Sequence, residues 1–202
     1  MIAAIAIGAF LAGSIPFGYV IARAFYGTDI RTQGSGNIGA MNALRTIGTP
    51  AAIAVLLLDA IKGFVPAAIV LALFHNHLWA AIAAALAVLG HCFSPWLQFK
   101  GGKGVATSYG ATLALSWPSG IIAVAGWIAG AGSTSYSSVG SMLGALLAVP
   151  ALWLFTRNVW CTLFGALSAL LILYSHRHNI ARLRSGRENG IAFLRQRRHR
   201  KA

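Results

Sequence analysis

The chain is dominated by apolar segments long enough to cross a lipid bilayer, and this feature restricts its fold more than any other. The apolar runs cover residues 2–25, 52–74, 79–97, 104–116, 119–131, 138–156 and 159–175. A membrane-spanning helix needs about 20 consecutive apolar residues, whereas a β-barrel shows short alternating strands. Charged residues make up only 9% of the sequence, against about 25% in soluble domains. The sequence therefore predicts an all-α integral membrane protein.

These runs predict a polytopic bundle of about seven transmembrane helices in one membrane-embedded domain, residues 1–202, with a basic cytoplasmic tail at 192–202. The first run lacks the basic start of a signal peptide and is too long for its apolar region, so we expect a single retained transmembrane helix. The runs at 104–116 and 119–131 are too short for a full crossing. They are either short tilted helices or a re-entrant pair buried within the protein.

The positive charges set the predicted orientation, because Lys and Arg are enriched in cytoplasmic loops. With the N-terminus outside and seven crossings, the cytoplasm receives almost all of the 16 Lys and Arg residues, including every one from Arg177 onward. The same topology places three polar, glycine-rich stretches, at 31–49, 98–105 and 174–191, on the cytoplasmic face. Because loops that converge on a rigid scaffold commonly build functional sites, we expect the site there.

The balance of charge indicates what the site binds. Asp29, Asp59 and Glu188 are the only carboxylates, and the net charge is +13, which predicts an anionic ligand or an anionic membrane surface. We expect no nucleic-acid partner, since the basic residues lie on no soluble domain or arm with interleaved aromatics. No histidine has carboxylates clustered near it, so we expect no metal ion and no other cofactor. Cys92 and Cys161 lie in apolar segments and are predicted to be buried.

The first stretch contains GSGNIGAMNALR at 34–45, which is dense in hydrogen-bond donors. Its glycines allow a ligand to approach backbone N–H groups closely, and its arginine supplies a planar fork suited to phosphate. A flexible loop rich in turn residues is the alternative, but it explains only the glycine and asparagine. The predicted substrate-binding residues are Gly34, Ser35, Gly36, Asn37, Asn42 and Arg45.

The second stretch contains GHCFSPWLQFKGGKGV at 90–105. Its basic turn, Lys100-Gly101-Gly102-Lys103-Gly104, is suited to holding a phosphate group. It is not a P-loop, because Val105 follows where a hydroxyl residue is required. The alternative is a positively charged loop between helices. His91 is predicted to be a hydrogen-bonded packing residue rather than a ligand.

The third stretch, HRHNIARLRSGRENGI at 176–191, follows the last apolar run directly. His176 and Asn179 are spaced i, i+3 and so share one face of a continuing helix. For His176 the alternative is an amphipathic side chain at the membrane interface. The arginines after Arg182 are interpreted as an anchor to the membrane surface.

Asp59 and Lys62 are also spaced i, i+3, within the second apolar run. Ionisable residues inside a membrane are costly and are usually paired. A carboxylate acting as an acid beside bound phosphate would be repelled by it. We therefore interpret the two residues as a structural ion pair that braces the first stretch.

Together, in this order, the three stretches resemble the motifs of the acyl-phosphate:glycerol-3-phosphate acyltransferases, the PlsY family. The resemblance extends to LLLDAIKG at 56–63 and SYSSVGSM at 135–142. It implies a multi-pass enzyme of the bacterial inner membrane that acylates the 1-hydroxyl of glycerol 3-phosphate from a fatty acyl phosphate, giving lysophosphatidate and phosphate. It further implies that the polar site contains Ser35, Arg45, Lys103, His176 and Asn179 as catalytic residues. Phosphate contacts are implied for Lys100, Gly101, Gly102 and Gly104.

The chemistry of an acyl phosphate agrees with this composition. It is a mixed anhydride with a good leaving group, so direct attack by the glycerol hydroxyl suffices and a covalent intermediate is unnecessary. Either His176 or a substrate phosphate takes the hydroxyl proton, and the sequence leaves both open. Arg, Lys and backbone N–H groups suit the negative charge of two phosphorylated substrates.

Two other functions are alternatives to this one. An acyl-CoA-dependent acyltransferase of the H-x4-D type requires aspartate five residues after a histidine. The positions that follow the interior histidines are Ala80, Ile82, Trp96, Ala181 and Leu183. A transporter for small organic phosphates would place polar residues facing one another at the bilayer midplane, whereas these cluster at one predicted face. Both comparisons favour the acyl-phosphate enzyme.

Overall fold

The structure is a computed structural model that describes residues 2–191 and 194, and its regular elements over these residues are all helices. The α-helices are α1 (Ile2–Ser14), α2 (Phe17–Tyr26), α3 (Ala40–Thr46), α4 (Thr49–Phe74), α5 (His77–Cys92), α6 (Val105–Leu115), α7 (Trp117–Thr134), α8 (Ser137–Thr156), α9 (Val159–Ser175) and α10 (Arg177–Arg184). Two short 3₁₀ helices, η1 (Ile30–Thr32) and η2 (Pro95–Leu97), lie in the loops. The predicted basic tail at 192–202 falls outside the described residues, apart from Leu194.

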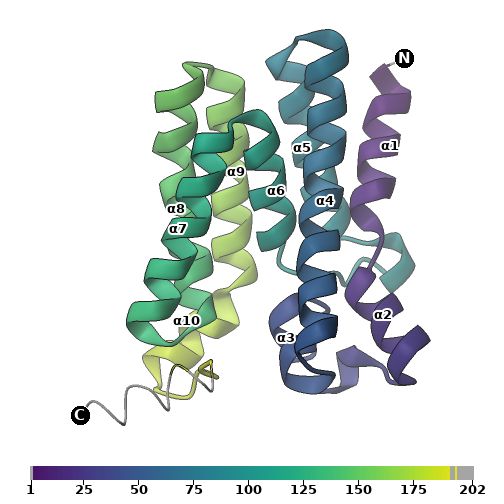
Figure 1. Ribbon diagram of the computed structural model, residues 1–202, viewed down its shortest axis with the longest axis vertical. Helices are drawn as coiled ribbons and strands as arrows, with labels where there is room; N and C mark the ends of the chain where they lie inside the picture. The colour runs from purple at the N-terminus through teal and green to yellow at the C-terminus, as the bar shows by residue number, and fades with distance from the viewer. Residues whose placement is uncertain (1, 192–193, 195–202) are drawn as a thin grey trace.

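The helices form two groups joined by a short central helix (Figure 1). α7, α8 and α9 pack together on one side, while α1, α4 and α5 pack on the other, with α6 between them. α1 begins at one end of the bundle, and α3 and α10 lie at the opposite end.

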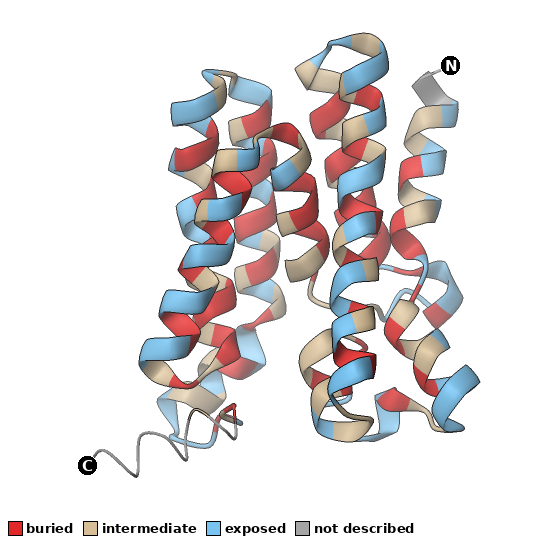
Figure 2. Cartoon of the chain, viewed as in Figure 1, coloured by how far each residue is buried: buried red, intermediate tan, exposed pale blue. Residues whose placement is uncertain are grey.

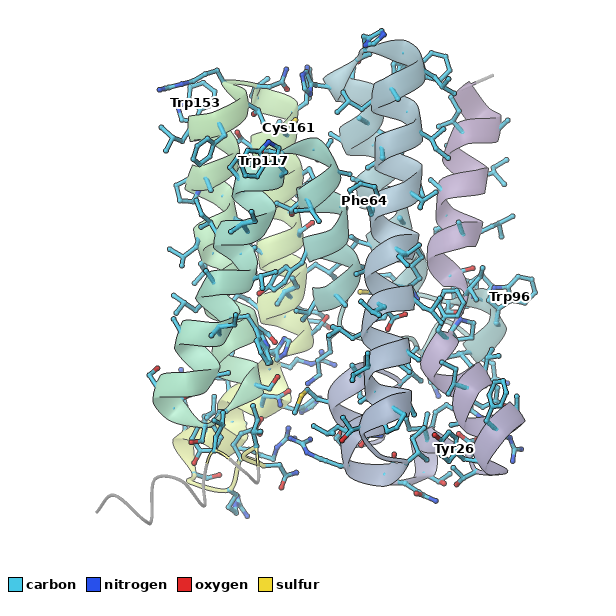
Figure 3. The ribbon with its side chains drawn as sticks, in the orientation of Figure 1. Tyr26, Phe64, Trp96, Trp117, Trp153 and Cys161 are labelled. Atoms are coloured by element: carbon cyan, nitrogen blue, oxygen red, sulfur yellow. The ribbon has the colours of Figure 1, made fainter. Side chains whose placement is uncertain are left out.

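The exterior of the bundle is apolar, as expected for a surface covered by lipid. On α4, Leu57, Ile61 and Leu73 are at least half exposed, and Figure 2 shows buried positions facing the interior of the bundle. Trp117 and Trp153 lie towards one end of the molecule and Tyr26 towards the other (Figure 3). Aromatic residues at both ends are typical of the two membrane–water interfaces. The prediction of an all-α integral membrane protein is confirmed.

The number of crossings stays a prediction. Three helices, α4, α8 and α5 extended to Leu97, are long and apolar enough to span a membrane, and up to five spans result if each bent helix pair counts as one. Each of the seven apolar runs is helical, as expected.

The first run is not the single helix that the sequence predicted. α1 and α2 meet at a bend of 43°, and Pro16 lies at the break. Proline has no backbone N–H and its ring clashes with the carbonyl one turn earlier, so it ends the helix. The bend leaves backbone groups inside the bundle that other residues must satisfy.

α6 places the second glycine-rich stretch inside the bundle rather than at its end. With 11 residues, α6 is only about 16 Å long, and it begins partway along the bundle (Figure 1). α5 descends from one end, and α6 returns to that same end before α7 crosses to the other. The sequence left 104–116 and 119–131 as either short tilted helices or a re-entrant pair, and in the structure they are α6 and α7, of 11 and 18 residues.

Glycines at helix interfaces allow these backbones to approach closely, as in other membrane bundles. A Cβ at any of them would collide with the facing helix. The positions are Gly13 and Gly90 between α1 and α5, Gly63 and Gly110 between α4 and α6, and Gly126, Gly130, Gly140 and Gly144 between α7 and α8.

Candidate active site

A cavity of about 460 Å³ opens between the two helix groups and receives residues from all three predicted stretches. The predicted site residues on its lining are Ser35, Asn37, Asn42, Arg45, Lys103, Gly104, His176 and Asn179. The others, which are Gly34, Gly36, Lys100, Gly101 and Gly102, are not on the lining. The tertiary structure thus brings together side chains separated by more than 140 positions in the sequence.

A hydrogen-bonded network fixes the polar end of the cavity. Lys103 Nζ donates to Asn179 Oδ1, and Asn179 Nδ2 donates to Glu188 Oε1 at 2.6 Å. Glu188 also accepts from Ser138 Oγ at 2.9 Å and from Arg182 Nε at 2.8 Å. Asn179 is therefore held in one orientation, and it holds Lys103 in turn.

The cavity is also lined by residues that the sequence did not predict for the site: Glu188, Arg182, Ser138, Ser141 and Tyr109. For Glu188 a signal existed, because it is one of three carboxylates in the chain and an isolated carboxylate among arginines needs an explanation. The SYSSVGSM segment is part of the family resemblance, but nothing in its sequence says which of its serines face the cavity.

At the polar end of the cavity, the pKa values of Lys103 and Glu188 are shifted from their ordinary values. Burial lowers the pKa of Lys103 to about 8, with Glu188 opposing and Arg182 and Arg45 reinforcing the shift. Burial raises the pKa of Glu188, but hydrogen bonds from its three partners outweigh that effect and keep the pKa below its ordinary value. Near neutral pH the site therefore combines a fixed carboxylate with several cations.

His176 is buried where α9 turns into α10. Its Nδ1 lies 2.8 Å from the carbonyl oxygen of Ile172. Because a carbonyl can only accept, Nδ1 carries the proton in this bond, and Nε2 is left as an acceptor in the neutral ring. Burial, and then the charge of Lys103, lower the pKa of His176 to about 4, so the imidazole is neutral at physiological pH.

Arg45 lies at the exposed side of the cavity, near the end of α3. One guanidinium nitrogen donates to the carbonyl of Asn189 at 3.1 Å, which ties the first stretch to the third. Since a guanidinium carries five donors in a planar fork, most remain available to a phosphate.

Asn42 was predicted to bind substrate, but its amide is fully used inside the protein. Its Oδ1 accepts from the backbone N–H of Ser35 at 2.8 Å, and its Nδ2 donates to the carbonyls of Ile30 and Gln33. The side chain is 2% exposed. Asn42 therefore shapes the loop that presents Ser35.

The basic turn is also organised differently from the prediction. The N–H groups of Gly101 and Gly102 donate to the carbonyls of Cys92 and His91, both at 3.0 Å, so they stabilise the loop against the end of α5 rather than facing a ligand. Lys100 lies in a separate cavity of about 350 Å³ beside Asp29 and Arg31. Of the basic turn, only Lys103 and Gly104 reach the site.

The rest of the cavity is a largely apolar groove between α4, α6 and α7. Its lining residues include Leu56, Ala60, Gly110, Leu113, Gly120, Val124, Trp127 and Ile128. Tyr109 also lines the cavity, and its hydroxyl donates to the carbonyl of Ser141 at 2.9 Å. A cationic end joined to an apolar groove fits a ligand with a phosphate head and a hydrocarbon chain.

A family profile described as glycerol-3-phosphate acyltransferase matches residues 3–186. The chain belongs to the glycerol-3-phosphate acyltransferase family. Among its relatives, the glycerol-3-phosphate acyltransferase of Rhodopseudomonas palustris is 46% identical over 191 residues, covering 94% of this chain and 95% of the relative. That of Bradyrhizobium diazoefficiens is 47% identical over 183 residues, covering 90% and 91%.

Solved structures of this acyltransferase family have the same fold. The glycerol 3-phosphate form of PlsY, an integral membrane glycerol 3-phosphate acyltransferase, aligns with a TM-score of 0.91 at 36% identity, covering 94% of this chain and 95% of that one. Its lysophosphatidic acid form aligns with a TM-score of 0.87 at 34% identity over the same shares. The family resemblance recognised from the three stretches is confirmed.

Proposed function

We propose that this chain transfers a fatty acyl group from an acyl phosphate to the 1-hydroxyl of glycerol 3-phosphate, releasing lysophosphatidate and phosphate in the first step of phospholipid synthesis. The observation that carries this is the two-part cavity, in which a cationic end joins an apolar groove. The two ends match the phosphate groups and the fatty chain of the substrates. The whole chain acts as one membrane-embedded acyltransferase domain.

Within this proposal, Arg45 and Lys103 bind the substrate phosphates. Both side chains line the cavity, and charge-assisted contacts to phosphate are stronger than neutral hydrogen bonds. The hydroxyl of Ser35 and the amide of Asn37 add donors at the same rim. Asn179 does not need to touch substrate, because it already orients Lys103.

The lowered pKa of His176 favours a substrate phosphate as the base. A group with a pKa of about 4 is a weak proton acceptor, whereas the second pKa of a phosphomonoester is about 6. The attacking hydroxyl then gives its proton to an oxygen of that phosphate, while the neutral His176 lines the site without taking the proton. The hydroxyl oxygen forms a bond to the acyl carbon, the bond from that carbon to the phosphate oxygen breaks, and phosphate leaves with the electron pair.

The enzyme is placed in the bacterial inner membrane with its polar site towards the cytoplasm. The distribution of Lys and Arg supports this orientation through the positive-inside rule. Both water-soluble reactants, glycerol 3-phosphate and phosphate, then exchange on the cytoplasmic side, while the acyl chain enters from the bilayer.

The proposal is tested with purified protein in detergent, supplied with glycerol 3-phosphate and either palmitoyl phosphate or palmitoyl-CoA. Formation of lysophosphatidate is followed over time. We expect turnover with palmitoyl phosphate and little or none with palmitoyl-CoA. Equal turnover with the two donors would contradict the proposed donor, and no product from either would contradict the function.

A further inference from the structure

Three ionisable side chains form a buried cluster at the wall of the cavity, on α4 and the end of α5. Asp59, Lys62 and His91 are 2%, 5% and 4% exposed. Lys62 Nζ lies 2.7 Å from Asp59 Oδ1, an ion pair without the alignment of a good hydrogen bond, and His91 Nδ1 lies 3.7 Å from the same oxygen. The predicted Asp59–Lys62 ion pair therefore has a third ionisable neighbour, His91.

Lys62 connects this cluster to the break between α1 and α2. Its Nζ donates to the carbonyl of Ile15 at 2.7 Å, a carbonyl at the bend that also accepts from the Phe17 N–H at 3.1 Å. Nζ also lies 5.5 Å from the centre of the Phe17 ring. One end of the cluster is thus fixed to the bent first helix pair.

His91 connects the cluster to the loop that carries Lys103. The carbonyl of His91 accepts from Gly102 N–H at 3.0 Å. The imidazole also packs so closely against Gly102 that a Cβ there would collide with Nε2 and both neighbouring ring carbons. Two residues further on, Gly104 has a positive φ of 78°, and a Cβ there would lie only 3.0 Å from Cys92 Sγ. Lys103 lies between these two fixed glycines.

A buried ionic group is often no more stabilising than apolar residues of the same size, so its presence here calls for a role beyond stability. Asp59 and His91 form part of the cavity wall, but they are almost completely buried, whereas Lys103 lines the cavity with a partly exposed side chain. The cluster links the fixed helices α1, α4 and α5 to the position of one cationic side chain.

We propose that the Asp59–Lys62–His91 cluster is a positioning device for Lys103, in which His91 supports the Gly101–Gly104 turn and Asp59 and Lys62 hold His91 in place. His91 is a positioning residue in this proposal, since its ring and its carbonyl both contact Gly102, the residue before Lys103. This proposal rests on the proposed function, in which Lys103 binds a substrate phosphate.

The first test replaces His91 with Gln. A displacement of about 1 Å at a binding group can lower a rate about 100-fold, so we expect kcat/KM to fall by about 30- to 100-fold. The matched control is His77→Gln, at the other end of the same helix, where the ring contacts Cys161 Sγ at 3.5 Å and not the loop. We expect this control to leave kcat/KM within about twofold, as for most substitutions remote from a site.

The pH profile separates positioning from loss of folded protein. Lys103 faces Arg45, Arg182, His176 and Glu188 in the cavity, and its pKa of about 8 follows mainly from burial. If the loop loosens, Lys103 gains water and its pKa rises towards the ordinary value. The alkaline decline of kcat/KM should then move to higher pH in His91→Gln. A reduced rate with an unmoved decline would mean only a loss of folded enzyme and would overturn the proposal.

A second test perturbs the same contact from the loop. Gly102→Ala places a methyl group against the His91 ring, so it should impair the enzyme in the wild-type background. Combined with His91→Ala, the two losses should be strongly non-additive, because removing the ring also removes the collision that the new methyl group causes. Fully multiplicative losses would overturn the proposal.

Lys103→Met is measured in parallel, because it distinguishes failure of the proposed function from failure of the positioning proposal. If Lys103→Met were fully active, the phosphate-binding role in the proposed function would fail. If Lys103→Met were impaired while His91→Gln behaved as wild type, only the positioning proposal would fail.

Discussion

Lys103 and Lys100 provide a matched comparison within one loop, since they are the same residue type three positions apart. The sequence assigned phosphate contacts to both. In the structure, Lys103 lines the main cavity and Lys100 is an exposed residue of the separate one. Replacing each with Met keeps most of the side-chain length while removing its charge, so the pair tests which cavity holds the phosphate.

The expected magnitudes follow from these positions. Loss of a hydrogen bond to a charged group typically costs about 1.5–3 kcal/mol, which corresponds to about a 10- to 100-fold loss in rate constant. Lys103 is partly buried and already oriented by Asn179. We therefore expect Lys103→Met to lower the rate constant by about 100-fold or more. For Lys100→Met, a surface substitution usually changes free energies by no more than about 0.5 kcal/mol, or about twofold.

The assay measures kcat/KM for glycerol 3-phosphate in detergent at saturating palmitoyl phosphate. Size-exclusion chromatography and thermal unfolding establish that both variants are folded, so that a loss of rate is not a loss of protein. If Lys100→Met were as impaired as Lys103→Met, the basic turn would act as one phosphate cradle. The assignment of the site to the larger cavity alone would then be refuted.

Three further predictions concern pH, metals and topology. Since burial lowers the pKa of Lys103 to about 8, kcat/KM should be level below that pH and fall by up to about tenfold per unit above it, as the ammonium loses its proton; a flat profile to pH 10 would contradict this. Activity should persist in EDTA, and its loss with recovery on adding Mg²⁺ or Zn²⁺ would show that the cationic site is insufficient. In a background lacking Cys92 and Cys161, His75→Cys should react with an impermeant thiol reagent in intact cells, whereas Ser185→Cys should react only after lysis. Labelling of Ser185→Cys from outside would reverse the proposed orientation.

The polar site was partly visible in the sequence because its residues are unusual for their surroundings. Arg45, Lys103 and His176 stand out in a chain with so few charges, and each lies in a stretch that interrupts the apolar pattern. Their spacing in three ordered stretches was sufficient to recognise the family. The sequence therefore identified the segments that carry the chemistry.

The role of each polar group depended on its partner, and partners come from distant parts of the chain. Asn42 looks like a ligand donor until its amide is seen bonded to Ile30, Gln33 and Ser35. Glu188 was passed over, although it accepts from residues on α8 and α10.

For the helices too, the sequence determined some properties and the tertiary structure determined others. Apolar composition determined that the chain is helical and enters the membrane, because a backbone in lipid must satisfy its own hydrogen bonds. Composition could not show that α6 begins inside the bundle, or that Lys62 would donate to the Ile15 carbonyl at the bend near Pro16. Burial and hydrogen bonding between distant segments are properties of the packed chain, so the tertiary structure alone decided which cations reach the cavity and which groups hold them there.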